Sequence, residues 1–232
     1  MNSKDFLTIR NNGNKNSNEF GLYVDTPPMF RMAQQKTTVI NIPGREESLY
    51  ITHDEFEDVP MPVKGFIFDN SYDISALYTW LRTAKEISFN SNPARYLKVK
   101  KLNGITPNYQ GNGKSIITID FVVSPFRYFT DDTDAVSPAK DFIIRNNGNY
   151  FSRPLYEISG NGNISIEIGD KKLTVFGISG NCTIDATRLL IHKDGITLKS
   201  EGVIPLLQVG ENRIKLTGNT TSVRIKKNQR DV

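Results

Sequence analysis

The sequence predicts a mainly β protein in two parts, with one helix. Three observations lead to this prediction. Runs of β-branched and aromatic residues recur between Pro-Gly and Asn-Gly turns, helical spacing of apolar residues occurs in one stretch, and the pattern changes after a polar, proline-containing break at 131–140. We therefore predict a first domain over residues 1–135 and a second over residues 136–232.

Two strands are predicted near the N-terminus, at 19–24 and 37–42. Each is a run of β-branched and aromatic residues, and each is followed by proline, at Pro27 and Pro43. The acidic stretch 45–62 alternates weakly between polar and apolar residues. It predicts either an extended hairpin arm that projects from a core or a solvated loop, and the pattern leaves both open.

A single helix is predicted after a strand at 63–69. Its apolar residues recur at i, i+3, i+4, i+7 and i+10 and therefore lie on one stripe. Ser71 or Asp73 can cap its first turn by accepting a hydrogen bond from a free backbone N–H. The residues of the stripe are Ile74, Leu77, Tyr78, Leu81 and Ala84.

Three further strands complete the predicted first domain. They cover 86–89, 96–102 and 115–125, and the last is extended by an aromatic run to Phe129. An Asn/Gly-rich loop at 103–113 separates the second strand from the third. We expect a hairpin turn at its end, because Asn-Gly supplies the positive φ that such turns need.

Short strands separated by Gly/Asn turns are predicted throughout the second domain. Many short strands at turn spacings of roughly 8–12 residues indicate a β-sandwich of about 90 residues. Gly160-Asn161-Gly162 is expected to be one of the hairpin turns, and the basic stretch 224–230 a solvated last strand. The predicted strands are 141–145, 155–159, 164–168, 172–176, 183–185, 189–191, 203–207, 213–216 and 222–226.

Composition excludes several classes of protein. The 232 residues contain 29 basic and 25 acidic side chains and one cysteine, so an internal disulfide is impossible. No segment resembles a signal peptide or the apolar run of about 18 residues that spans a membrane. We expect a soluble protein that folds in a reducing cytoplasm, with no membrane partner. The net charge of +4 gives no indication of a specific nucleic-acid partner.

Groups suited to catalysis or metal binding are few. His53 and His192 have no third histidine with which to build a zinc site, and we interpret them as solvated or capping side chains. Cys182 lies in a predicted strand, where cysteine usually behaves as a small buried apolar group. The acidic run 131–134 lacks the spacing of a calcium loop, so a solvated linker is preferred. The sequence therefore predicts no catalytic residue, no metal and no cofactor.

The order of several short motifs resembles the siphophage distal tail protein (Dit) family. Residues 39–45, Val-Ile-Asn-Ile-Pro-Gly-Arg, are similar to an "IPGR" segment near the start of these proteins, and residues 158–164 resemble their I-x-G-x-G-x-I turn. Glu47, where the family often has glycine, and Ile204-Pro205, in place of an aromatic-Pro pair, depart from the pattern. Other positions match in the family's order: Trp80-Leu81, Arg95-Tyr96, 146–150, 153–155, Asp185, Leu206-Leu207 and 210–212.

This resemblance implies a structural protein and not an enzyme. Dit proteins form a hexameric ring, the baseplate hub, at the distal end of the long flexible tail of phages of Gram-positive bacteria. In such a protein the N-terminal domain is a β-sandwich or split-barrel-like fold with one helix and a projecting β-hairpin arm. The C-terminal domain is a galectin-like β-sandwich.

The resemblance also implies partners and a location. The expected partners are other copies of the chain in a homo-hexamer, the major tail (tube) protein, the tail-associated lysin or tip protein, and a receptor-binding or baseplate protein. The ring joins the tail tube to the host-adsorption apparatus. The expected location is the virion of a phage or prophage, after synthesis in the bacterial host cytoplasm.

A ring needs a contact between unlike surfaces, and the arm is the segment that we expect to make it. Arg45 is expected to form an ion pair between subunits, and a plain surface arginine at a turn is the alternative. A carbohydrate-binding module for host cell-wall saccharide is the alternative function, although Trp80, the only tryptophan, lies in the predicted helix. The candidate interface residues are Arg45, Glu46, Glu47, Tyr50 and Phe56.

Overall fold

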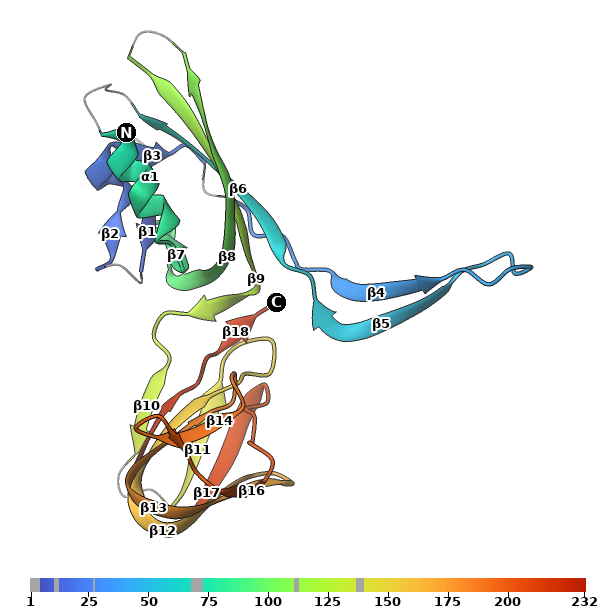
Figure 1. Cartoon of the computed structure of the whole chain (residues 1–232), viewed down its shortest axis with the longest axis vertical. Coiled ribbons are helices and arrows are strands. Elements are labelled where there is room, and N and C mark those ends of the chain that lie inside the picture. The colour runs from blue at the N-terminus through green and yellow to red at the C-terminus, as the bar shows by residue number, and fades with distance from the viewer. Residues whose placement is uncertain (1–4, 11–12, 27, 68–72, 111–112, 137–139) are drawn as a thin grey trace. The chain divides into compact units, whose positions relative to one another are not determined.

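The computed structural model describes residues 5–10, 13–26, 28–67, 73–110, 113–136 and 140–232. The chain divides into two compact units, one of residues 1–130 with Val232 and the other of residues 131–231. Both are mainly β, which confirms the predicted fold class (Figure 1). Features predicted at Pro27, 68–69, Ser71 and 111–112 lie outside the described residues.

The first unit is built on one antiparallel sheet that curls around an apolar core. Its strands lie in the order β2-β1-β7-β8-β9-β6-β3. Asp5, just before β1, forms an isolated bridge with Val24 of β3, so the two sides of the sheet meet at a single bridge and not along a ladder. The strands are β1 (Leu7–Ile9), β2 (Lys15–Asn16), β3 (Leu22–Val24), β6 (Val59–Ile67), β7 (Glu86–Phe89), β8 (Asn92–Tyr109) and β9 (Ser115–Phe129).

Alternation along β6 and β9 supplies much of this core. Val63 of β6 pairs with Ile119 of β9, and both side chains are almost completely buried. Successive side chains of a strand point to opposite faces, so every second residue of each strand enters the core. The inward residues of β9 are Ile117, Ile119, Phe121 and Val123.

The predicted helix is present as α1 (Ile74–Arg82). The Asp73 carboxylate accepts hydrogen bonds from the backbone N–H groups of Ser75, at 2.9 Å, and Ala76, at 3.1 Å, which satisfies two donors of the first turn. The helix buries Leu77, Trp80 and Leu81 against the core. Ala84, expected on the same stripe, lies beyond the last helical residue.

Two local predictions in the first unit are wrong. The segment predicted as a strand at 19–24 begins as a 3-10 helix, η1 (Ser17–Phe20), because the Glu19 side chain accepts from the Asn16 N–H at 2.9 Å and the turn ends at Gly21. The segment 103–109, predicted as loop, continues β8. The long β9 offers it backbone partners along its whole length, and the Asn/Gly residues only shift the register.

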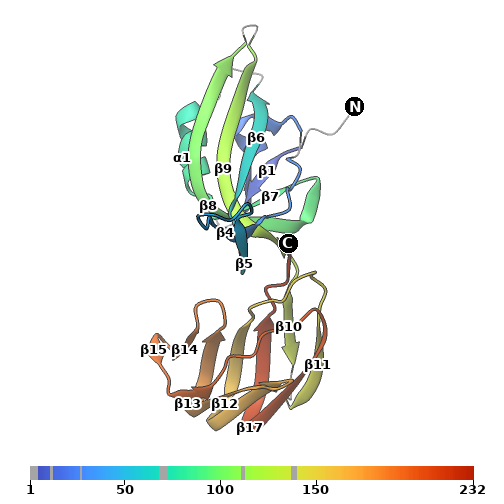
Figure 2. The ribbon, with the colours of Figure 1, turned by 90° about the vertical axis from the view of Figure 1, so that its right-hand side faces the viewer.

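The second unit is a sandwich made of three long strands that bend (Figures 1 and 2). These are β12 (Leu155–Ile168), β13 (Lys171–Asp185) and β17 (Gly210–Lys226). Both halves of each long strand contribute to one apolar cluster. The shorter strands of this sheet are β10 (Thr133–Val136), β11 (Asp141–Asn146), β14 (Leu190–Lys193), β15 (Ile196–Thr197) and β16 (Ser200–Gly202). The last strand of the chain, β18 (Arg230–Asp231), is not part of it.

Each half of a long strand has its own neighbours. β10 pairs with the C-terminal half of β17, whereas β11 pairs with its N-terminal half. In the same way β14 pairs with the C-terminal half of β13 and β16 with its N-terminal half. The bends therefore let three strands serve both layers.

The predicted hairpin turn at Gly160-Asn161-Gly162 is wrong, because this segment is a bend inside β12. The register between β12 and β13 shifts between Gly162 and Ile164. A Cβ atom on Gly160 would lie 2.4 Å from the Asn219 carbonyl oxygen of β17, so the close crossing of the backbones requires glycine. The short strands predicted on either side of each bend are therefore the two halves of one long strand, β12, β13 or β17.

Asparagine side chains satisfy backbone groups at these bends. The Asn161 carboxamide oxygen accepts from the Gly180 N–H at 3.2 Å, and the Asn163 oxygen accepts from the Gly177 N–H at 3.1 Å. A bulge removes ladder hydrogen bonds, and these side chains replace two of them. The Gly/Asn composition that resembles a series of turns is therefore the composition of a bent sheet.

Two more predictions in the second unit need correction. Residues 203–207, predicted as a strand, lie outside the named strands and form one isolated bridge, Ser152 to Leu207. The stretch 224–230 is not a solvated strand, because Gln229 is 1% exposed and Arg230 is 8% exposed.

Candidate assembly surface

The candidate site is a two-stranded hairpin that stands apart from the sheet of the first unit (Figure 1). It consists of β4 (Gln35–Ile40) and β5 (Leu49–Phe56), and we call residues 35–56 the arm. The two strands form a separate antiparallel sheet, with Ile40 opposite Leu49. The connection turns at Pro43-Gly44, where Gly44 adopts a φ of +83°. An arm is therefore present, and the solvated-loop alternative is wrong.

The extent of the arm differs from the prediction. The expected arm covered 45–62, but the strand predicted separately at 37–42 is its first half. Residues 59–62 already belong to β6, where Val59 and Met61 are buried in the core. The alternation that made 45–62 look continuous is shared by β5 and β6, so the pattern alone could not show where the arm ends.

The arm exposes a concentration of large apolar side chains. Its residues are exposed from 35 to 55, apart from the half-buried Ser48. An isolated two-stranded hairpin is marginally stable in water, and contiguous exposed apolar surface usually marks an interaction site. The apolar side chains, with their exposed fractions, are Val39 50%, Ile40 38%, Ile42 42%, Leu49 42%, Tyr50 67% and Ile51 43%.

Polar contacts hold the two strands of the arm together nearer its base. The Lys36 ammonium lies 2.6 Å from the Glu55 carboxylate, and this hydrogen bond lowers the pKa of Glu55 and raises the pKa of Lys36. The Thr38 hydroxyl lies 2.9 Å from the His53 imidazole. Because these side chains are in solvent, the ion pair contributes little to stability. His53 is therefore a strand-pairing residue on the arm.

The base of the arm is anchored in the first unit. The Glu57 N–H donates to the Gln34 carbonyl at 2.9 Å, which closes the hairpin. The Phe56 ring packs edge-on against Phe126 of β9, with centroids 5.7 Å apart. Phe56 also contacts the core cluster of the unit. Of the predicted interface residues, Phe56 is the one that holds the arm to its own chain.

The other predicted interface residues lie toward the far end of the arm. Arg45 follows Gly44 in the turn, and its N–H donates to the Ile42 carbonyl at 3.1 Å. Glu46 and Glu47 are exposed in the same connection, and Tyr50 lies opposite Val39. Sequence reasoning missed the apolar partners contributed by β4, although the run 37–42 beside a Pro-Gly turn carried the signal of a hairpin strand.

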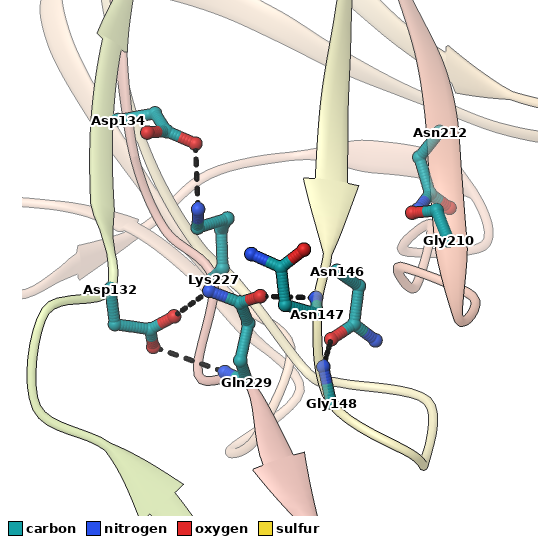
Figure 3. Close-up of polar contacts among 9 residues, drawn as sticks. All are labelled: Asp132, Asp134, Asn146, Asn147, Gly148, Gly210, Asn212, Lys227 and Gln229. Atoms are coloured by element: carbon teal, nitrogen blue, oxygen red, sulfur yellow. Dashed lines mark hydrogen bonds and ion pairs between the residues drawn. The ribbon is translucent and has the colours of Figure 1, made fainter. Parts of the chain in front are cut away.

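A cluster of polar side chains lies inside the second unit, and we call it the clasp (Figure 3). It consists of Asp132, Asn146, Asn147, Lys227 and Gln229. The Asp132 carboxylate accepts from the backbone N–H of Gln229, at 3.0 Å, and from its side-chain amide, at 2.8 Å. The Gln229 amide oxygen accepts in turn from the Asn147 N–H.

The clasp corrects the interpretation of 131–134 as a solvated linker. Asp132 is 5% exposed, and burial raises its pKa to about 6, against the Gln229 hydrogen bonds, which lower it. Lys227 is 9% exposed and pairs with Asp134 at 3.0 Å. The carboxylate oxygens of Asp132 and Asp134 are therefore bound by donors of the protein itself. The donor to Asp132, Gln229, is 97 residues away in the sequence.

Two asparagines in the segments that resemble the Dit family, 146–150 and 210–212, have structural roles in this unit. The Asn146 oxygen accepts from the Gly148 N–H at 3.0 Å, and its amide donates to the Tyr150 carbonyl at 3.0 Å. Asn212 donates to the carbonyl groups of Gln208 and Gly210. Buried asparagines of this kind fix loops by pairing backbone groups.

The remaining chemistry-bearing residues are placed as follows. Cys182 is buried, as predicted, and burial raises the pKa of its thiol to about 11, so the thiol is protonated at neutral pH. The Nδ1 atom of His192 is buried without a hydrogen-bond partner among the described residues. Among the residues that the structure describes, no three His, Cys, Asp or Glu side chains lie close enough together to hold a metal ion.

A groove of about 560 Å³, lined by both polar and apolar side chains, lies in the second unit. Glu157, Thr183 and Arg224 are among its lining residues, and none of those residues is aromatic. Sugar-binding faces usually combine polar groups with aromatic rings, so the groove is a poor match to the carbohydrate-binding alternative. Across the described ranges, no helix has the length and apolar content needed to cross a bilayer.

Comparison with known proteins finds a solved structure with a similar fold. No family model and no curated protein sequence matches the chain. Among solved structures, the chain is similar to the crystal structure of the Dit protein of phage SPP1, with a TM-score of 0.65 and 14% sequence identity over 96% of this chain and 98% of that one. The chain has a Dit-like fold. The SPP1 protein is described as a paradigm of the hub adsorption apparatus in phages that infect Gram-positive bacteria.

Proposed function

We propose that the protein is a structural subunit of a phage or prophage tail, the distal tail protein of a long flexible tail. The observation that carries the proposal is the arm: a hairpin with apolar faces exposed to solvent, on a chain whose fold is like that of SPP1 Dit over nearly its whole length. A surface of this kind is stable when another chain covers it.

In this proposal the subunits form a homo-hexameric ring. The arm of one subunit contacts the next subunit, and Arg45, Glu46, Glu47 and Tyr50 lie in the contact. The ring joins the major tail (tube) protein to the tail-associated lysin or tip protein, and the galectin-like second unit offers a docking face for a receptor-binding or baseplate protein. The site of action is the virion.

The mass of the full chain in solution tests the ring. Light scattering at increasing concentration should show a species of ring size, and negative-stain microscopy should show a closed ring. A chain that stays monomeric at high concentration and binds cell-wall saccharide on an array would contradict the proposal and support the carbohydrate-binding module.

Removing the arm tests its role in assembly. We expect replacement of residues 36–55 by an Asn-Gly turn to abolish the ring, because Gln35 and Phe56 can still close the hairpin but no apolar face remains. Circular dichroism should show both units folded, since the arm contributes little to either core. Intact rings after this deletion would refute the role of the arm.

A matched variant controls for the loss of charged groups. The double substitution Lys36→Ala with Glu55→Ala removes only the exposed ion pair of the arm. We expect it to assemble like the wild type, because such pairs contribute at most about 1 kcal/mol. Loss of the ring in this control would assign assembly to the ion pair and not to the apolar faces.

A further inference from the structure

A small pocket in the first unit is lined by residues that flank the arm in sequence. Phe30 precedes the arm and Met61 follows it, while Phe89 and Leu97 come from β7 and β8. The volume is about 160 Å³. Pockets for small molecules begin at roughly 300 Å³, so this one suits a single side chain presented by a partner.

Two arginines, Arg95 and Arg127, line the same pocket. The guanidinium carbon of Arg127 lies 4.9 Å from the centroid of the Phe30 ring. Its Nε atom is buried and has no hydrogen-bond partner among the residues that the structure describes. A buried donor without an acceptor is costly, and a carboxylate is the acceptor that arginine pairs with best.

The far end of the arm carries the complementary groups. Tyr50 is 67% exposed, and Glu46 and Glu47 precede it in the connection. Charge is also divided between the arm and the body of the unit. The arm, residues 35–56, contains two basic and four acidic side chains, whereas the rest of residues 1–130 contain thirteen basic and nine acidic ones. The arm is therefore acidic and the surface around the pocket belongs to a basic body.

We infer that this pocket receives the arm tip, residues 42–50, of a second copy of the chain. Tyr50 fills the apolar floor, and a carboxylate of Glu46 or Glu47 accepts from Arg127. The inference rests on the proposed ring and adds the surface that the arm contacts.

The contact joins two unlike surfaces of the chain. The tip lies at one end of the arm, and the pocket is lined by residues that flank its other end. Repeated head-to-tail from copy to copy, such a contact closes into a ring when the rotation between copies allows, whereas a reciprocal exchange of arms would stop at a dimer. Each subunit then gives one arm and receives another.

A mixing experiment tests this arrangement. The variant Tyr50→Ala keeps the pocket and loses the anchor, whereas Arg127→Glu keeps the arm and loses the pocket. Neither variant should assemble alone, with affinity reduced at least about thirty-fold by loss of a central anchor. An equimolar mixture should give a heterodimer and nothing larger, because one working surface of each kind remains. Native mass spectrometry measures the species.

Two controls match the size and charge of these changes. Tyr109→Ala removes a tyrosine that is 66% exposed outside the arm, and Lys101→Glu reverses an exposed charge on β8. Both should form rings like the wild type. Normal rings from Arg127→Glu would overturn the pocket assignment and leave the hub proposal intact, whereas a monomeric wild type would contradict the ring itself.

Cross-linking tests the contact independently of ring stability and of variant folding. The photo-reactive residue p-benzoylphenylalanine replaces Tyr50, and chains of light and heavy isotope composition are mixed before irradiation. We expect peptides that contain Phe89 or Arg127 to be joined to the arm of the other chain. Cross-links formed only within one chain, or only to other surfaces, would overturn the inference.

Discussion

Asp132 is a carboxylate enclosed by its own unit, and its environment gives the protein a titratable group near pH 6. Its two oxygens accept from Gln229, and Lys227 donates its backbone N–H to the Asp132 carbonyl at 2.8 Å. Burial disfavours the charged form more than these donors favour it, so the pKa is raised. A local sequence pattern cannot reveal this, since the partner is 97 residues away.

We expect the contribution of Asp132 to the free energy of unfolding of the second unit to be larger at pH 5 than at pH 7. The folded pKa of about 6 exceeds the ordinary value of 3.8, so the folded state binds the proton more tightly, and this stabilisation is lost as pH rises through 6. The change between the two pH values is about 1 kcal/mol. Urea unfolding of the wild type and of Asp132→Asn at both pH values measures this change. The difference in stability between pH 5 and pH 7 should vanish in Asp132→Asn.

Asp141 provides a control of opposite sign. Its hydrogen bond to the Arg213 guanidinium lowers the pKa of this exposed carboxyl, so any stabilisation is lost as pH falls. Asp141→Asn should therefore leave the pH dependence between 5 and 7 unchanged. A wild type that shows the same pH slope as Asp132→Asn would contradict the assignment to Asp132.

At the scale of elements, the bends of β12, β13 and β17 decide the shape of the second unit. Alternation and composition predicted most of the strand residues correctly, because side-chain periodicity is local. They did not predict which strands are continuous, because a bend and a turn use the same Gly and Asn residues. Backbone proximity, such as that of Gly160 to Asn219, depends on strands far apart in the chain.

Glycine substitutions should separate crowding from backbone strain. Gly160→Ala places a Cβ atom against the backbone of β17 and should destabilise the second unit by about 3 kcal/mol or more. Gly162 has a φ of +84° and open space around it, so Gly162→Ala should cost about 1 kcal/mol from strain alone. Denaturant unfolding measures both, and equal costs would contradict the crowding at Gly160.

The arm shows the same limit for the candidate site. The residues Arg45 to Glu47 and Tyr50 were identified from their acidic surroundings and from the resemblance, and the structure places them toward the far end of a hairpin. The run 37–42 predicts a strand, but its pattern does not show that this strand pairs with β5 and forms half of the arm. Whether the side chains of this strand are exposed depends on whether another layer of the fold covers them, and the periodicity of the sequence contains no information on that.

At the scale of the whole molecule, each unit has its own apolar cluster. That two domains fold independently, with the division expected at 135/136, stays a prediction. We expect a fragment of residues 131–232 to unfold cooperatively. A fragment of residues 136–232 should be less stable by at least about 2 kcal/mol, because it lacks Asp132 and leaves two buried Gln229 donors unpaired. Thermal unfolding of both fragments measures the difference, and equal stability would contradict the role of the clasp.

The clasp also fixes where the second unit begins and ends. Asp132, the second residue of the unit, is hydrogen-bonded to Gln229, which lies two residues before its end at Asp231. A unit whose ends are neighbours is a cassette. It can be exchanged for another domain with equally close ends, or its ends can be joined and the chain reopened at the exposed β14–β15 connection, without rethreading the strands between them.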